Sequence, residues 1–442
     1  MNTLAAHITP PLSAERAQTI AQSLDLRALP RDFLDNPYPV YAALRESEPF
    51  KRMPDGSYFL TRHADLVAVY RDAKVFSSDK QVEFGPKYSH APFNQPPYAT
   101  ASGLAPLYEH HTSSLVFNDP PLHTRVRRLI MGALTRRAIE AMEPGLVKLV
   151  DSLLDKIEAQ GGGDLIEDFA SAIPVEVIGN LLGVPHAERE PLRGWSLAIL
   201  GALEPSLAPQ QEALGNQSVT EFLAYLRELV AQRRQHPGDP EHDVLTRLIQ
   251  GEENGDTLSE VELLHNCVFL LNAGHETTTN LIGNALIGLQ EWPQERLRLL
   301  TDLQAAANEE AQSQVLGLAV DEFLRFESSN QLSNRRTLQA TQVNGVDLPA
   351  GALLTLCIGA ANRDPAVYEN PEQLDLRRTG NKHLAFGFGV HQCAGLSLAR
   401  LEGRIAIGRF LQRFPDVQLP QAPVRGGRAR FRGFLHAPFS TR

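Results

Sequence analysis

Three features that mark secreted, membrane and nucleic-acid-binding proteins are missing from this 442-residue chain. Its three cysteines are too few for a disulfide framework, which indicates a reducing compartment. It has no apolar run long enough to span a bilayer, and its first residues do not pair a basic start with an apolar stretch. We therefore expect a soluble, cytoplasmic protein with neither a signal peptide nor a membrane anchor.

An excess of basic charge is also missing. The chain has 52 acidic and 42 basic residues, for a net charge of -10, which argues against a general nucleic-acid binder. Hydrophobic residues make up 43% of the chain, as in ordinary globular proteins, and 442 residues are enough for a large core.

Helical patterns dominate from about Leu122 onward. Thr257 and Glu260 have the spacing of a capping box, which predicts the start of a helix there. Apolar residues then continue to about Leu289, before Pro293. Such a helix would be roughly 50 Å long at 1.5 Å per residue.

The other segments predict short strands and loops. Residues 76–117 have little periodicity, and residues 204–217 are rich in proline and glutamine, so we expect loops in both places. Short strands and turns follow residue 334. These patterns predict a mainly α fold with small β-sheets, of class α+β. We expect one domain over residues 1–442, with a loosely ordered segment at 1–30.

One cysteine lies in an unusual setting, the stretch AFGFGVHQCAG at residues 385–395. Gly387 and Gly389 precede Cys393, Gly395 follows it, and a helix is predicted directly afterwards. Glycines permit tight turns and close approach to another group, and a helix N-terminus lowers the pKa of a nearby thiol. The residues suit a thiolate that binds a flat partner. An inert cysteine, a zinc ligand or a catalytic thiol with His391 as its base are the alternatives that this loop leaves open.

The stretch Phe386-Gly387-Phe388-Gly389-Val390-His391-Gln392-Cys393-Ala394-Gly395 resembles the haem-binding signature of the soluble bacterial cytochrome P450 monooxygenases. The resemblance implies haem b as the cofactor and Cys393 as the ligand of its iron. It also implies that His391 contacts a haem propionate, and that Phe386, Gly387 and Gly395 line the haem. A thiolate ligand favours cleavage of the O–O bond.

A second stretch, Ala273-Gly274-His275-Glu276-Thr277-Thr278, resembles the family's oxygen-activation segment and lies in the predicted long helix. Gly274 lacks a side chain and would let the helix approach a ligand. Glu276 and Thr277 provide an acid and an alcohol, and cleavage of dioxygen consumes two protons that such a pair can deliver. The alternative is a polar patch whose threonine hydroxyls bond to the helix itself.

Basic residues in two further segments resemble the family's propionate contacts. His123 and Arg127 are one helical turn apart in NDPPLHTRVRR, and either Arg335 or Arg336 precedes a predicted strand. Buried carboxylates require charged or donor partners, which these residues would provide. The alternative for His123 and Arg127 is a solvated basic helix.

Glu322 and Arg325 have the Glu-x-x-Arg spacing of a structural pair in the family. The usual third member of that network is an arginine, but the corresponding stretch here reads Pro371-Glu372-Gln373-Leu374. Gln373 carries no charge, so the identity of the third member is an open question.

The resemblance covers nearly the whole chain and implies a one-domain, mostly helical P450 fold. It predicts a monooxygenase, acting as a monomer, that inserts one oxygen atom of O₂ into a C–H bond of an apolar or amphiphilic small molecule. Electrons would come from NAD(P)H through a ferredoxin or flavodoxin, because no G-x-G-x-x-G stretch follows a predicted strand. A fatty acid is our first choice of substrate. A peroxide-driven hydroxylase and a non-catalytic haem ligand sensor are the alternatives.

Overall fold

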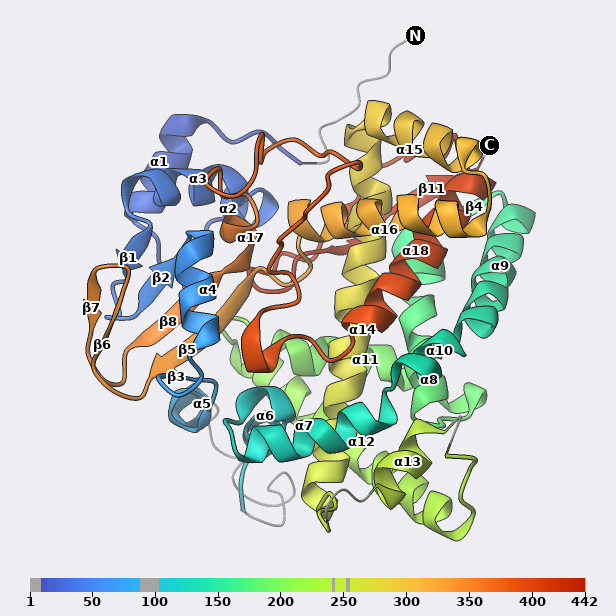
Figure 1. Ribbon diagram of the computed structural model, residues 1–442, viewed down its shortest axis with the longest axis horizontal. Coiled ribbons are helices and arrows are strands. Elements are labelled where there is room, and N and C mark those ends of the chain that lie inside the picture. Colours follow the sequence, from blue (N-terminus) through green and yellow to red (C-terminus); the bar gives the residue numbers. More distant parts are fainter. Residues whose placement is uncertain (1–8, 88–102, 241–242, 252–254, 442) are drawn as a thin grey trace. The chain divides into compact units, whose positions relative to one another are not determined.

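The computed structural model describes residues 9–87, 103–240, 243–251 and 255–441 (Figure 1). Contacts divide the chain into two compact units, and each unit combines separate stretches of sequence. Unit 1 comprises Met1–Asp72, Pro144–Ile173 and Thr277–Arg442, and unit 2 comprises Ala73–Glu143 and Pro174–Glu276. The chain is helix-rich with small sheets, which confirms the predicted fold class.

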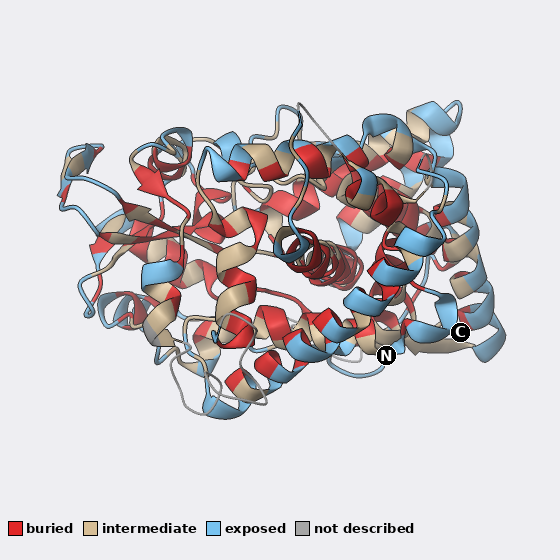
Figure 2. Ribbon diagram, turned by 90° about the horizontal axis from the view of Figure 1, so that it is seen from below, coloured by how far each residue is buried: buried red, intermediate tan, exposed pale blue. Residues whose placement is uncertain are grey.

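Helices make up most of unit 1, and many of them have one buried and one exposed face (Figure 2). They are α1 (Ala14–Gln22), α2 (Arg31–Asp35), α3 (Tyr38–Ser47), α4 (His63–Arg71), α9 (Glu143–Gln160), η2 (Leu165–Ala170), α15 (Pro293–Ala305), α16 (Glu309–Phe326), α17 (Ile358–Ala361), η4 (Gly389–His391) and α18 (Leu396–Arg413). Helix α3 shows why the sequence folds this way. Val40, Tyr41 and Leu44 lie on one face and join Phe59 in a hydrophobic core.

Short strands complete unit 1. Four of them, β1 (Phe50–Arg52), β2 (Tyr58–Leu60), β8 (Leu353–Cys357) and β5 (Leu332–Thr337), run in the order β1-β2-β8-β5. The β2–β8 pair is parallel, and the β1–β2 and β5–β8 pairs are antiparallel. Three two-stranded sheets pair β6 (Thr341–Val343) with β7 (Val346–Leu348), β9 (Val424–Arg425) with β10 (Phe434–His436), and β4 (Gly162–Asp164) with β11 (Pro438–Ser440). The strands after residue 334 confirm the sequence pattern.

Unit 2 is also mainly helical. Its elements are β3 (Phe76–Ser77), α5 (Gln81–Lys87), α6 (Pro106–Ser113), η1 (Leu115–Phe117), α7 (Leu122–Ala133), α8 (Arg136–Glu140), most of α10 (Ala172–Leu181), η3 (His186–Glu188), α11 (Glu190–Gly201), α12 (Pro209–Gln235) and α13 (Val244–Gln250). Helices α11 and α12 pack through Trp195 and Phe222, whose rings stack with centroids 4.9 Å apart.

Helix α14 (Glu260–Glu291) is the predicted long helix, and the boundary between the two units falls inside it, after Glu276. The predicted capping box was two residues out of place. The backbone N–H of Ser259 donates to Oε2 of Glu262 at 2.9 Å, and the backbone N–H of Glu262 donates to Oγ of Ser259 at 3.3 Å. Ser259 and Glu262 therefore cap the helix, because the capping pattern occurs twice in TLSEVE and only the second copy is used.

Helices form in both expected loops and in the N-terminal segment. In the first, at 76–117, helices α5 and α6 form, although residues 88–102 of it lie outside the described part. The expected loop at 204–217 becomes helical at Pro209, because proline is tolerated in the first turn of a helix. In the segment expected to be loosely ordered, residues 14–22 form α1, which buries Ala17 and Ile20. None of the described helices is long and apolar enough to cross a membrane.

Candidate active site

The cysteine loop, residues 385–395, is fixed by its backbone. Gly387 and Gly389 have φ angles of 64° and 74°, in the left-handed region that favours glycine. A side chain at Gly389 would also collide with the backbone carbonyl of Tyr70. The N–H of Cys393 donates to the carbonyl of Phe386 at 2.8 Å, which closes the loop. The first two glycines thus have the conformational role that the sequence predicted.

Of the three cysteines, only Cys393 is partly exposed. Cys267 and Cys357 are buried, and burial raises the pKa of each thiol to about 12, so both stay protonated. Cys393 lies two residues before Gly395, the N-cap of α18, where free N–H groups favour an anion. A side chain at Gly395 would meet no atom within 4 Å, so the space beside it is open. The partly exposed thiol, the helix N-terminus near it and the open space beside Gly395 fit a thiolate ligand with a flat group beside it.

Helix α14 carries an accessible stripe along one face. Between residues 263 and 287, the partly exposed positions are Phe269, Leu270, Ala273, Gly274 and Thr277, and the other residues are buried. At 3.6 residues per turn these five positions lie on one side of the helix. The stripe contains three of the predicted site residues. A side chain at Gly274 would collide with Ile178, so the space beside this glycine is filled by a side chain of α10.

The neighbours of this stripe are buried. Glu276 is 5% exposed and His275 is 1% exposed. Burial, together with nearby Arg193, lowers the pKa of His275 to about 3, so its imidazole is neutral. His275 thus lies off the accessible stripe.

Helix α7 holds His123 and Arg127 in unit 2. His123 is buried and Arg127 is partly exposed, one turn further along. The nearby Arg125 binds two groups near the start of α14. Its guanidinium forms an ion pair with Glu262 and donates to the carbonyl of Thr257 at 3.1 Å. It therefore ties α7 to the start of α14.

Strand β5 separates Arg335 from Arg336, because consecutive strand residues point to opposite faces. The guanidinium of Arg335 lies 5.1 Å from the ring centroid of Tyr70, and the carbonyl of Tyr70 adjoins Gly389. Arg335 is therefore linked to the cysteine loop through Tyr70. The Nε atom of Arg336 is buried without a hydrogen bond within the described chain.

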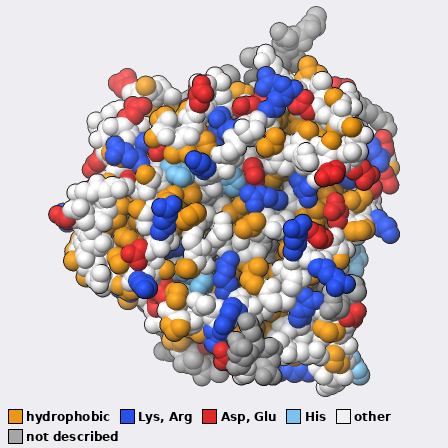
Figure 3. Space-filling model, viewed as in Figure 1, with side chains coloured by type: hydrophobic (Ala, Val, Ile, Leu, Met, Phe, Trp, Pro, Cys, Tyr) orange, Lys and Arg blue, Asp and Glu red, His pale blue; other side chains and the backbone are white. Residues whose placement is uncertain are grey.

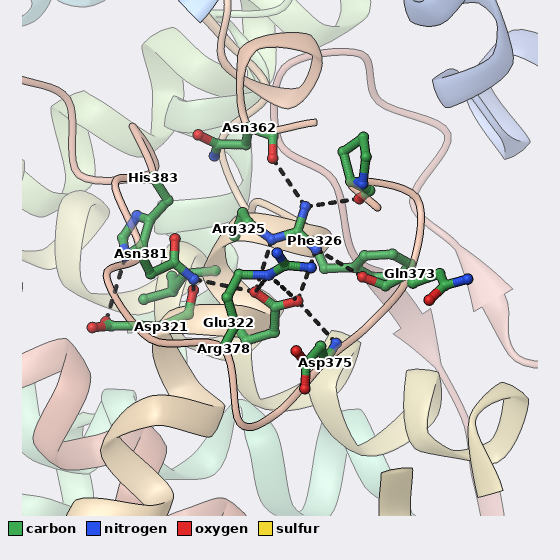
Figure 4. Close-up of polar contacts among 12 residues, drawn as sticks. Asp321, Glu322, Arg325, Phe326, Asn362, Gln373, Asp375, Arg378, Asn381 and His383 are labelled. Atoms are coloured by element: carbon green, nitrogen blue, oxygen red, sulfur yellow. Dashed lines mark hydrogen bonds and ion pairs between the residues drawn. The ribbon is translucent and has the colours of Figure 1, made fainter. Parts of the chain in front are cut away.

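A network of charges supports this loop, as Figure 4 shows. Glu322 and Arg325 form two hydrogen bonds of 2.8 Å each, with both side chains fully buried. The backbone carbonyl of Gln373 accepts a bond of 2.9 Å from Arg325. Arg378 supplies the additional positive charge, since its Nε atom lies 3.1 Å from Oε2 of Glu322. Sequence reasoning missed Arg378.

Two contacts connect this network to the cysteine loop. Asn362 accepts a hydrogen bond of 2.7 Å from the N–H of Leu384, directly before the loop, and its own carbonyl accepts one from Arg325. Asp321 binds Arg400 of α18 at 2.7 Å, and the guanidinium of Arg400 lies 4.8 Å from the ring centroid of Phe386. Helix α16 therefore positions both ends of the loop.

Comparison with known proteins identifies the family. The sequence model of the family described as Cytochrome P450 matches residues 203–425. Cytochrome P450 107B1 of Saccharopolyspora erythraea is 35% identical over 410 residues, which cover 92% of this chain and 94% of that protein. This chain belongs to the cytochrome P450 family. The Biotin biosynthesis cytochrome P450 of Bacillus subtilis is 33% identical over 88% of this chain and 91% of its own length. The Vitamin D(3) 25-hydroxylase of Pseudonocardia autotrophica is 35% identical over 88% of each.

A solved structure gives the same result for the fold. P450BioI, in complex with acyl carrier protein ligated to hexadec-9Z-enoic acid, superimposes with a TM-score of 0.82 and 31% identity. The match covers 93% of this chain and 99% of that one. The chain is thus a bacterial-type cytochrome P450 monooxygenase whose cofactor is haem b, and the partly exposed thiol and the open space beside Gly395 fit that cofactor.

Proposed function

We propose that Cys393 binds the haem iron, and that the enzyme inserts one oxygen atom into a C–H bond of an apolar or amphiphilic small molecule. The observation that carries this proposal is the contrast among the three thiols. Cys393 is partly exposed at the start of α18, whereas Cys267 and Cys357 are buried. The bound haem supplies the activation of dioxygen.

The haem carboxylates need donors, and the chain offers several. We assign His391 and Arg335 in unit 1, and His123 and Arg127 in unit 2, to this role. Arg335 is a better candidate than Arg336, because the Tyr70 ring under its guanidinium belongs to the residue whose carbonyl adjoins the cysteine loop. Phe386, Gly387 and Gly395 would line the haem on the cysteine side.

Protons for the reaction would come through α14. Thr277 lies on the accessible stripe with Ala273 and Gly274, and Glu276 is buried directly before it. A hydroxyl at the edge of the stripe holds a proton at its oxygen, and a neighbouring carboxyl group can replace that proton. Ala273 presents only a methyl group on the stripe, beside which the substrate and the cofactor would meet.

We propose a fatty acid or fatty acyl chain as the substrate class to test first. The similarity to P450BioI, whose structure holds a sixteen-carbon acyl chain on a carrier protein, supports this choice. Phe269 and Leu270 on the accessible stripe provide apolar contacts suited to such a chain. A ferredoxin or flavodoxin would bring the electrons from NAD(P)H, in the cytoplasm.

The absorption spectrum of the reduced protein with bound carbon monoxide tests whether Cys393 binds the haem iron. We expect the far red-shifted Soret band of a thiolate complex, lost in Cys393→Ser and kept in Cys267→Ser and Cys357→Ser. A red-shifted band in Cys393→Ser would refute the assignment.

The substrate class is tested by adding free fatty acids, acyl carrier conjugates, steroids and terpenoids to the enzyme and following the Soret band. A shift with steroids alone would rule out the acyl class.

A further inference from the structure

A cavity of about 460 Å³ lies in unit 1. Its walls come from α3, the C-terminal half of α14, α16, and the paired strands β9 and β10. The described residues that line it include none of the cysteine loop and none of the accessible stripe on α14. Its volume is within the range of small-molecule sites.

A glycine opens this cavity. Gly288 lines it from the last turn of α14. A side chain at Gly288 would meet no atom within 4 Å, so close packing does not explain the glycine. The space in front of it is the cavity itself.

A buried cation points to the ligand's charge. The Arg425 side chain is 8% exposed, and neither Nε nor Nη1 has a hydrogen bond within the described chain. Nη2 donates to Oγ1 of Thr9 at 3.2 Å, and Nη1 lies 3.7 Å from Oε1 of Glu327, beyond hydrogen-bond distance. Glu327 is already bound by Arg432, which is also buried. Two buried cations therefore share one carboxylate.

The other acids of the cavity are engaged elsewhere. Glu291 accepts two hydrogen bonds from Thr9, at 2.6 and 3.0 Å, and Glu372 binds Arg363 at 2.7 Å. Arg425 therefore has carboxylates nearby and lies 4.2 Å from the ring centroid of Phe434, but its Nε and Nη1 atoms have no acceptor within hydrogen-bond distance in the described chain. Buried donors without an acceptor are costly, and a carboxylate offers the two acceptors that a guanidinium binds best.

The remaining walls suit an aromatic body. Trp292 and Phe326 meet edge to face with ring centroids 5.6 Å apart, and Tyr38 lines the same cavity. Asn284 adds a polar contact, because its Oδ1 atom is buried without a hydrogen bond while its amide N–H donates to the carbonyl of Arg432. That oxygen would accept a hydrogen bond from a hydroxyl group.

We propose that this cavity binds a small aromatic monocarboxylate, with the carboxylate on Arg425 and the ring against Trp292 and Phe326. The cavity lining contains none of the residues that we assign to the haem, to proton delivery or to the substrate, so the proposal does not depend on the proposed function. Binding should stabilise the folded enzyme without changing the haem spectrum, because only the folded state has the cavity.

The test titrates the haem-loaded enzyme with 3-phenylpropionate by calorimetry while the Soret band is recorded, with 3-phenylpropionamide as the uncharged control. We expect saturable binding of the acid with an unchanged Soret band, and at least about 10-fold weaker binding of the amide. Equal affinity for acid and amide, no binding at millimolar concentration, or binding seen only together with a Soret shift would each refute the proposal.

Two variants locate the bound ligand, and a third serves as their control. Arg425→Gln should weaken binding of the acid about 10-fold or more. Arg428→Gln removes the same charge from a neighbouring residue outside the cavity lining and should leave affinity unchanged. Gly288→Leu fills the cavity without touching Arg425 and should abolish binding while haem content and folding persist. Gly288→Leu still tests the proposal if Arg425→Gln fails to fold. Unchanged affinity in Gly288→Leu would overturn the assignment.

Discussion

Two buried polar clusters, one in each unit, are built on opposite principles. Glu322 in unit 1 is fully buried and binds the guanidinium groups of Arg325 and Arg378. His110 in unit 2 is also buried, but it contacts imidazoles and an amide, and the carboxylate of Glu109 lies 3.4 Å from Nε2 of the neighbouring His265. Asn272 lies 3.4 Å from the Nε2 atom of His110, and the His265 ring stacks on the His110 ring with centroids 5.7 Å apart.

The difference lies in how each cluster responds to change. A charged network tolerates burial only while every charge keeps its partner, so losing one member leaves a buried charge behind. The His110 imidazole is uncharged at neutral pH because burial lowers its pKa, so it cannot accept a proton without burying new charge. Unit 1 should therefore be sensitive to mutation of its network, and unit 2 should be sensitive to acid.

The largest expected effect is that of Glu322→Ala. It leaves Arg325 buried without its carboxylate, which should cost about 3–5 kcal/mol of unfolding free energy. Because Asn362 joins Arg325 to the start of the cysteine loop, haem retention should fall as well. Urea unfolding and haem content would measure both effects.

Two controls sharpen this result. Asp302→Ala removes the carboxylate of a surface pair, whose Arg377 is 58% exposed, and should cost less than about 1 kcal/mol. Arg378→Gln should have an intermediate effect, because one of two guanidinium partners of Glu322 is lost. A loss as small in Glu322→Ala as in Asp302→Ala would contradict the contrast.

Sequence reasoning found the local part of the site and missed the rest for a geometric reason. The cysteine loop lies within eleven residues, so its glycines, its turn and the helix after it can all be predicted from neighbouring positions. Arg378 is 56 residues from Glu322, and His110 is 155 residues from His265. Only the fold brings such pairs together, and no spacing rule covers them.

The predicted starts of helices α14 and α12 were wrong for a different reason. The sequence TLSEVE contains two overlapping capping patterns, and local propensity cannot choose between Thr257 and Ser259. The proline-rich start of α12 was predicted as a loop, yet Pro209 lies in its first turn. In both places the choice depends on packing farther along the helix.

The second prediction concerns Thr277, on the accessible stripe of α14. Thr277→Ala should leave substrate binding unchanged but lower the product formed per NAD(P)H about 10-fold, with the difference appearing as peroxide, because proton delivery contributes 10²–10⁴-fold in typical enzymes. Thr278→Ala is the matched control, since Thr278 is buried off the stripe. Equal uncoupling in both variants, or in neither, would argue against the assigned role.

The third prediction tests the acid sensitivity of unit 2. Burial and the adjacent His111 hold the pKa of His110 well below its usual 6.5, and burial lowers that of His275 to about 3. The folded state therefore binds fewer protons than the unfolded state, so stability is full above pH 6.5 and falls as the pH drops below it. For His275 this loss should be about 1.4 kcal/mol between pH 7.5 and 5.5, and His110 should add a loss in the same direction.

Substitution isolates one of these residues. His110→Gln should make the unfolding free energy from urea curves less dependent on pH at constant ionic strength, because it removes one buried imidazole. His236→Gln, at an exposed position, should leave the curve unchanged. An unaltered pH dependence in His110→Gln would show that the buried imidazole is not responsible.

The smallest expected effect concerns the electron donor and the arginines of α7. Arg125 and Arg128 both lie on α7, but Arg125 binds Glu262 and the carbonyl of Thr257. Arg128 is exposed, and Figure 3 shows arginine and lysine side chains among acidic and apolar ones on the face in view. Arg128→Glu should therefore slow ferredoxin-supported turnover about two- to five-fold at low salt, because local potential governs encounter. The effect should fade at high salt, where the Debye length shortens to about 3 Å at 1 M.

Arg125→Glu should instead lower the free energy of unfolding, since it breaks the contact between α7 and α14. Peroxide-supported turnover separates the two explanations: it should be unchanged in Arg128→Glu, and an equal loss there would mean that the substitution disturbs the haem site and not donor binding.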